Sequence, residues 1–233
     1  MDAWIDFAKG PLFAVTFLVM VLGLARQIGL QIYFLFVKKG RRLKQVPWSK
    51  MAKETLGWLV PVNHVEPGTG LFSTASFLMH IGVIVVPLLL ADHIALWNAL
   101  LGIGLPSIGQ GLADILTLLT VACGSLLLIF RIFRARHRLV SRSSDYILLV
   151  VVLLPFITGY LASHPRVNPF PWSAMMLTHI LSAELLFVLV PFTKLAHVVL
   201  FFFDRISAVH WQLRPGAGDK VAEALFGREV KAS

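Results

Sequence analysis

Charged residues and cysteine are both scarce in this chain, and each shortage excludes a class of protein. Only 14% of the 233 residues are charged, whereas 57% are hydrophobic and the mean hydropathy is +0.78. A soluble domain of this length carries roughly 25% charged residues. The single cysteine, Cys123, lies in an apolar run. One cysteine excludes a disulfide framework, a Cys-x-x-Cys pair, covalent c-type heme attachment and an iron–sulfur cluster held by this chain.

Long apolar stretches take the place of the missing charge. A helix needs roughly 20 residues to cross the core of a bilayer. The sequence predicts an all-α integral membrane bundle of five transmembrane helices over residues 1–205, with a polar C-terminal tail over 206–233. The first and last stretches exceed the required length, so we expect them to tilt or to project from the membrane. The five stretches lie at about 11–37, 71–91, 112–133, 146–163 and 174–203.

The basic residues that give a net charge of +9 are unevenly distributed. KKGRRLKQVPWSKMAKE follows the first stretch and RIFRARHRLVSR follows the third, whereas the opposite loops hold one basic residue, Arg166. Lys and Arg accumulate on the cytoplasmic side of membrane proteins. We therefore expect the N-terminus outside and the C-terminus in the cytoplasm of a bacterial or archaeal inner membrane. The same location argues against binding of nucleic acid and for contact with lipid headgroups.

Four of the eight histidines, His80, His93, His179 and His197, lie within or at the ends of apolar stretches. A histidine inside hydrocarbon is costly and is therefore a candidate functional residue. On an unbroken helix, His179 and His197 would share one face, about 27 Å apart. Antiparallel packing of the second and fifth stretches would set His80 opposite His197 and His93 opposite His179. Two such pairs of imidazoles can hold two six-coordinate b-type hemes.

The second stretch does not present its two histidines on one face. Thirteen residues separate His80 from His93, which places them about 140° apart on a straight helix. Pro87 lies between them and can kink or unwind the helix, which would redirect His93. Otherwise His93 is an interfacial polar residue or a quinone ligand.

Other chemistries fit the pattern less well. Four histidines spread over about 20 Å or more cannot share one ion, and no cluster of cysteines or carboxylates accompanies them. A heme-free transporter that relays protons is expected to show more intramembrane carboxylates than Glu184 alone, or broken helices at the midplane of the membrane.

The segment HILSAELLFVLVPFTKLAH, residues 179–197, resembles the final membrane span of the gamma subunit of respiratory nitrate reductase. FLMHIGVIV, LARQIGLQIY and SSDYILL extend the resemblance over about residues 11–210. That family consists of five-span diheme cytochromes b that oxidise quinol. Related subunits serve heterodisulfide-reductase-like complexes of sulfur metabolism, which this chain resembles at least as closely.

The resemblance implies that His80 and His197 hold the inner heme iron and that His179 holds one side of the outer heme iron. The family's second histidine of span two comes ten residues after the first, where this chain has Leu90. His93 would therefore replace it as the outer ligand. The family also has a lysine near the quinol in the outer loop, and the corresponding LPSIGQGLAD has none.

Quinol oxidation releases two electrons and two protons, so the site requires a proton acceptor near the outer heme. Asp92 or Asp114 suits a base, and the amide of Gln110 can hydrogen-bond the quinol oxygen. Alternatively, Asp114 caps the start of the third stretch and Gln110 faces water. His164 completes the set of quinol-site candidates.

Arg26 lies inside the first stretch, where a permanent charge needs a partner. We expect a heme propionate, or alternatively Glu184. Lys194 is a second propionate candidate, unless it snorkels to the surface.

Together these residues predict a membrane cytochrome b subunit of a multi-subunit oxidoreductase. Menaquinol or ubiquinol would be oxidised near the outer face, and electrons would pass through two b-type hemes to a cytoplasmic iron–sulfur subunit. Quinone reduction, in which electrons would pass in the opposite direction, would use the same two hemes. The alternatives are a single-heme quinone-reactive anchor with only His80 and His197 ligated, and a heme-free anchor or transporter.

Overall fold

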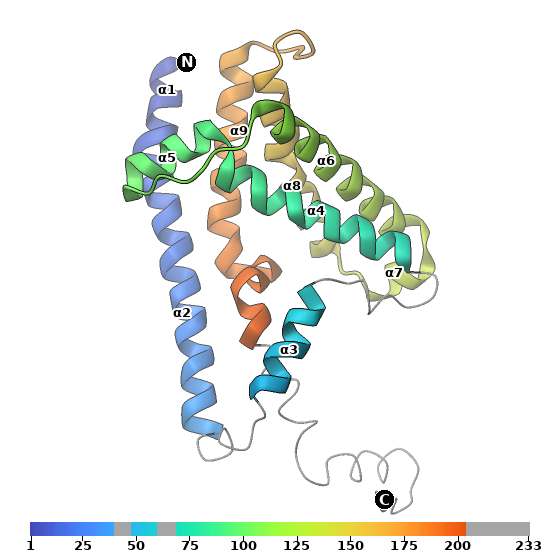
Figure 1. Ribbon diagram of the computed structural model, residues 1–233. Coiled ribbons are helices and arrows are strands. Elements are labelled where there is room, and N and C mark those ends of the chain that lie inside the picture. The colour runs from blue at the N-terminus through green and yellow to red at the C-terminus, as the bar shows by residue number, and fades with distance from the viewer. Residues whose placement is uncertain (40–47, 60–68, 204–233) are drawn as a thin grey trace, which may run out of the picture. The chain divides into compact units, whose positions relative to one another are not determined.

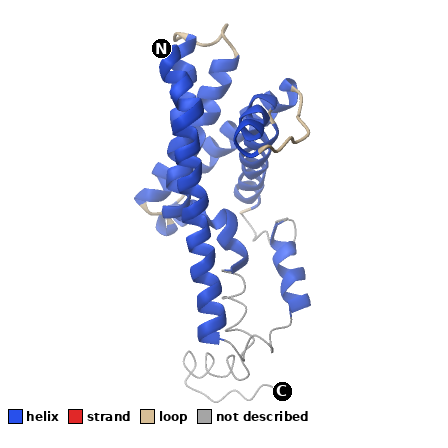
Figure 2. Cartoon of the chain, turned by 90° about the vertical axis from the view of Figure 1, so that its left-hand side faces the viewer, coloured by secondary structure: helices blue, strands red, loops and turns tan. Residues whose placement is uncertain are grey.

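The structure is a computed structural model that describes residues 1–39, 48–59 and 69–203, and the elements it defines there are all helices (Figure 2). The predicted all-α class is confirmed, as are five helices long and apolar enough to cross a membrane. The predicted start of the polar tail at 206 lies outside the described residues. The five helical spans are Asp2–Phe34, Gly70–Leu89, Gln110–Phe133, Ser143–Ser163 and Trp172–Phe192.

The chain forms two compact units, which are described separately. The first comprises residues 1–20 and 61–189, and the second comprises 21–60 and 190–233. The first unit contains α1 (Asp2–Phe7), η1 (Ala8–Leu12), the start of α2 (Phe13–Lys39), α4 (Gly70–Leu89), α5 (Ala91–Leu101), α6 (Gln110–Phe133), α7 (Ala135–Val140), α8 (Ser143–Ser163) and α9 (Trp172–Leu189). The second contains the rest of α2, α3 (Trp48–Leu59), η4 (Val190–Phe192) and η5 (Lys194–Ala196).

Within the first unit, α4 packs against α6, α6 against α8, and α8 against α9 (Figure 1). Glycines allow two of these helix pairs to approach closely, as is common between membrane helices. A Cβ at Gly82 would collide with the hydroxyl of the buried Thr120, and one at Gly124 would collide with Leu153. The core of this packing consists of Ala75, Met79, Cys123, Leu127, Leu149 and Leu153.

The first helical span begins earlier than the sequence predicted. Helical structure starts at Asp2 rather than near residue 11, and it passes through a π-helical turn, η1, that contains Pro11. Ile5 and Ala8 are buried against Ile180 of α9. The charged residues of this segment lie on its exposed face, so their presence did not exclude a packed helix.

The last apolar stretch is not one unbroken helix, and that prediction is wrong. The α-helix α9 ends at Leu189 and is followed by two 3-10 turns, η4 and η5, before helix continues to Phe203. Pro191 lacks the backbone N–H that an α-helix requires. Thr193 has extended backbone, and its hydroxyl accepts a hydrogen bond from the N–H of Leu195 at 3.3 Å. His179 and His197 therefore do not belong to one regular helix, and the prediction that they share one of its faces is wrong.

Candidate functional site

His93 of α5 and His179 of α9 face each other in the first unit. Their ring centroids are 6.0 Å apart and their planes are inclined by only 14°. Each ring donates from Nδ1 to a backbone carbonyl. Nδ1 of His179 lies 2.8 Å from the carbonyl oxygen of Pro155, and Nδ1 of His93 lies 3.2 Å from that of Val86. The predicted juxtaposition of these two histidines is confirmed.

A break in the second span places His93 in this position. The helix α4 ends at Leu89, Leu90 is extended with φ −68° and ψ 134°, and α5 begins at Ala91. Pro87 cannot donate a helical hydrogen bond, so the predicted local unwinding near it is confirmed. Side chains of α5 bind carbonyls at the end of α4. The carbonyl of Val86 accepts from His93, and that of Pro87 accepts from the indole N–H of Trp97 at 3.1 Å.

Trp97 also anchors α5 through its ring. Its centroid lies 5.5 Å from that of Phe13, 5.6 Å from that of Phe17 and 6.2 Å from that of Phe187. Aromatic contacts at these separations stabilise packing beyond the area they bury. The cluster therefore connects the helix that carries His93 to the one that carries His179.

Gly159 of α8 makes room for the imidazole of His179. A Cβ at this position would lie 2.8 Å from Cε1 and 2.9 Å from Nδ1 of the ring. Because Gly159 has only hydrogen there, the imidazole lies directly against the backbone of α8. One turn earlier on the same helix, the carbonyl of Pro155 accepts its hydrogen bond.

The other two candidate histidines share the same backbone-bonded arrangement. Nδ1 of His80 lies 2.6 Å from the carbonyl oxygen of Ser76, and Nδ1 of His197 lies 2.8 Å from that of Lys194. A hydrogen on Nδ1 leaves the lone pair of a neutral imidazole on Nε2, the usual arrangement of a metal-binding histidine. His80 belongs to the first unit and His197 to the second, and their pairing stays a prediction.

The spacing of His93 and His179 suits a metal held between them. Metal–imidazole bonds are about 2.0 Å long, so two rings in line on one metal have centroids about 6 Å apart. In the part of the chain that the structure describes, no group of three or more His, Cys, Asp or Glu residues could hold a metal ion. A metal between these two rings would therefore need further ligands from a non-protein group, and a porphyrin provides four.

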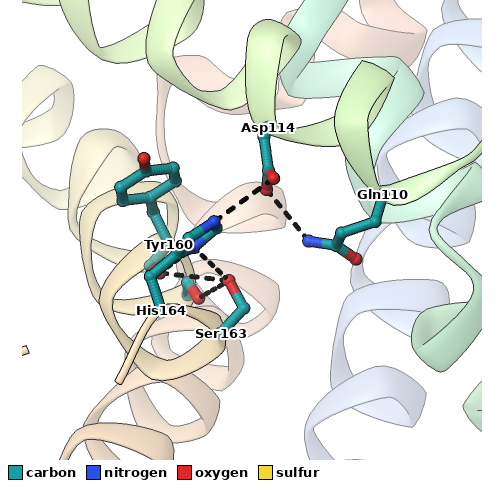
Figure 3. Close-up of polar contacts among 6 residues, drawn as sticks. Gln110, Asp114, Tyr160, Ser163 and His164 are labelled. Atoms are coloured by element: carbon teal, nitrogen blue, oxygen red, sulfur yellow. Dashed lines mark hydrogen bonds and ion pairs between the residues drawn. The ribbon is translucent and has the colours of Figure 1, made fainter. Parts of the chain in front are cut away.

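Three of the four quinol-site candidates form a polar cluster where α6 begins and α8 ends (Figure 3). The amide of Gln110 donates to Oδ1 of Asp114 at 2.9 Å. Nε2 of His164 lies 3.3 Å from Oδ2 of the same carboxyl group. Asp114 does not cap α6, because the N-cap of this helix is Gly109 and it has no side-chain cap hydrogen bond. Gln110 is exposed, as its alternative interpretation predicted, and its amide also binds Asp114.

The remaining candidates lie apart from this cluster. Asp92 is exposed on α5 beside His93. Burial lowers the pKa of His93, while its backbone hydrogen bond to Val86 and the charge of Asp92 oppose that shift. Arg26 of α2 and Lys194 of η5 are both exposed in the second unit, and their roles toward propionates stay predictions.

Glu184 of α9 is only 3% exposed, and both of its carboxyl oxygens lack a hydrogen-bond partner among the described residues. The suggested pairing of Glu184 with Arg26 joins residues of different units and stays a prediction.

The sequence analysis did not single out Gly159, Tyr160 and Ser163. Gly159 lies against the ring of His179, and the other two residues contact His164. Tyr160 stacks on His164 with centroids 4.2 Å apart, and Ser163 hydrogen-bonds the same ring. A glycine among large side chains in LLPFITGYLAS was the available signal, because glycine in a membrane helix often marks close approach.

Comparison with known proteins identifies one relative. A protein of Nitratidesulfovibrio vulgaris whose printed name is simply "Protein" is 36% identical over 157 residues, which cover 66% of this chain and 67% of the relative. No family model matches the chain, and no solved structure matches it. Identity at this level over two thirds of both chains shows common descent, and the chain belongs to the same family as this Nitratidesulfovibrio vulgaris protein.

Proposed function

We propose that this chain is the membrane cytochrome b subunit of a multi-subunit oxidoreductase, and that it exchanges electrons between the quinone pool and an iron–sulfur partner. His93 and His179 hold the outer b-type heme, and His80 and His197 hold the inner one. When bound, heme accepts and donates single electrons. The end at which α6 begins and α8 ends faces the outside, as the distribution of basic residues predicts.

The observation that carries the proposal is the geometry of His93 and His179. Two imidazoles at 6.0 Å, each bonded through Nδ1 to a backbone carbonyl, have the spacing and tautomer of a bis-histidine metal site. These carbonyl bonds hold each ring in orientation. Gly159 leaves room for the ring of His179 against α8.

The chain's other residues provide binding and exclusion of water. The aromatic cluster around Trp97 excludes water from the side of α5 that faces Phe13 and Phe187. Arg26 and Lys194 bind heme propionates by charge-assisted hydrogen bonds. The quinol is bound near Gln110, Asp114 and His164, with Asp92 as a further acidic group. The cytoplasmic basic segments dock the partner subunit or anionic lipid.

Heme stoichiometry of the purified protein tests the proposal. Pyridine hemochrome analysis is expected to give two b-type hemes per chain, with a reduced alpha band in the region typical of b-type heme. His179→Gln should remove one of the two. His137→Gln is the matched control, because His137 stacks on Phe72 away from the proposed ligands and should retain both hemes.

The measured heme content distinguishes the diheme cytochrome from the single-heme anchor and from the heme-free anchor or transporter. One heme per wild-type chain, with content unchanged by His179→Gln, would establish the single-heme anchor instead. A colourless protein would overturn the cytochrome proposal and leave the heme-free anchor or transporter.

A further inference from the structure

In the polar cluster formed by Gln110, Asp114 and His164, the hydrogen-bond acceptors determine which atoms carry hydrogen. Ser163 has one hydroxyl hydrogen, and its oxygen lies 3.1 Å and 3.0 Å from the carbonyl oxygens of Gly159 and Tyr160. Carbonyl oxygens only accept, so the serine hydrogen is used there. The oxygen of Ser163 is then an acceptor toward the imidazole of His164.

Nδ1 of His164 carries a hydrogen for the same reason. It lies 2.9 Å from the carbonyl oxygen of Tyr160 and 3.1 Å from the oxygen of Ser163, and both accept (Figure 3). In a neutral ring Nε2 would then present a lone pair to the carboxylate of Asp114, 3.3 Å away. That approach is attractive only when a proton lies between the two groups. Asp114 and His164 therefore bind one proton between them, as imidazolium with carboxylate or as imidazole with carboxylic acid.

This pair lies near the proposed electron acceptor and also reaches solvent. Gly159, which contacts the ring of His179, lies one helical turn, about 5.4 Å along α8, before Ser163. The side chains of His164 and Asp114 are 31% and 25% exposed. His164 follows the end of the apolar span Ser143–Ser163, and we take this end of α8 as the route of the proton to water.

Other titratable groups belong to the same or neighbouring elements. Tyr160 stacks on His164, and Arg166 follows it in the loop. His80 belongs to α4, which packs against α6, and His179 belongs to α9, which packs against α8. Asp92 and His93 belong to α5, which packs against α4.

We propose that Asp114 and His164 act as one shared proton acceptor for a bound p-benzoquinol, and this inference rests on the proposed function. The amide N–H of Gln110 donates to Asp114, and its carbonyl oxygen is an acceptor that could bind a quinol hydroxyl. One quinol loses two protons and two electrons and becomes one quinone. The hemes that His93, His179, His80 and His197 would hold under the proposed function would supply acceptors for one electron each. The pair first releases the proton that it holds. The first quinol proton then enters the deprotonated pair and leaves, and the second follows by the same route.

The test compares reduction of the purified complex by a short-chain quinol with reduction by dithionite, which needs no proton acceptor in the protein. Asp114→Asn and His164→Gln should each slow quinol-driven heme reduction by about 10²-fold or more and abolish its pH dependence. Dithionite should still reduce the full heme content, which shows that the variants fold. Asp6→Asn, which removes an exposed carboxylate from α1, is the matched control and should keep the wild-type rate.

The outcomes distinguish this inference from the proposed function. A wild-type protein that contains heme but is not reduced by quinol would overturn both. Quinol reduction at the wild-type rate and with the wild-type pH profile in both variants would overturn the shared acceptor alone.

Discussion

A methyl group added at Gly159 tests the contact between α8 and His179 directly. In Gly159→Ala, the new Cβ would lie 2.8 Å from Cε1 of the ring, whereas ordinary contact begins at 3.4 Å. The imidazole must therefore retreat by at least 3.4 − 2.8 = 0.6 Å. A displacement of this size strains the 2.8 Å hydrogen bond to Pro155 and moves the ring relative to His93.

The energetic consequence has two opposing parts. Overpacking of a tight contact costs about 1–3 kcal/mol. Replacing glycine by alanine within a helix raises the free energy of unfolding by about 0.5–1 kcal/mol. We therefore expect a net loss of stability of about 0–2.5 kcal/mol, which lowers Tm by up to several degrees.

Thermal unfolding in detergent and heme content measure the two consequences separately. Gly111→Ala is the matched control, because it adds the same methyl group within α6 where no atom lies within 4 Å. This control should keep the wild-type heme content and an equal or higher Tm. In Gly159→Ala, the heme content should fall from two towards one per chain.

Two results would refute this reasoning. A Tm at or above that of the control Gly111→Ala would show that α8 does not contact the imidazole as described. An altered Tm with undiminished heme content would show that the ring of His179 can move without loss of the cofactor, and would argue against its role as a ligand.

Three further changes test other parts of the structure. Trp97→Phe removes the hydrogen bond to Pro87 and should lower the free energy of unfolding by about 1–3 kcal/mol. The control Trp4→Phe, at a 65% exposed residue, should leave Tm unchanged. Equal effects of the two changes would contradict the anchoring of α5. Glu184→Met removes a buried carboxyl group without a described partner and should raise Tm by the equivalent of about 1–3 kcal/mol, so a lower Tm would show that the carboxyl is paired. Burial lowers the pKa of His93 below 6.5 in the folded protein, so the unfolded chain binds more protons and stability should fall as pH drops below about 6.5. In heme-depleted protein, His93→Asn should therefore reduce the difference in Tm between about pH 7.5 and 5.5. An undiminished difference would contradict this assignment.

Three prolines in apolar stretches show how far local sequence could predict the fold. Pro87 lies two residues before the end of α4, and the sequence predicted a disturbance there. Pro155 lies inside the uninterrupted α8. Pro191 lies in the 3-10 turn after α9, where the sequence predicted a continuous helix. Proline removes the same hydrogen bond in each case, and neighbouring helices and side chains decide whether the freed carbonyls are satisfied.

The sequence by itself determined the helical class, the number of apolar helices and the identity of the chemically unusual residues. These properties depend on hydropathy and residue type over about 20 neighbouring positions, because lipid forces each crossing segment to satisfy its own backbone. Only the tertiary structure decided that His93 faces His179, that Gly159 admits its ring and that Asp114 meets His164. Those contacts depend on where α4 breaks and on which helix faces pack together, and both result from interactions between segments far apart in the chain.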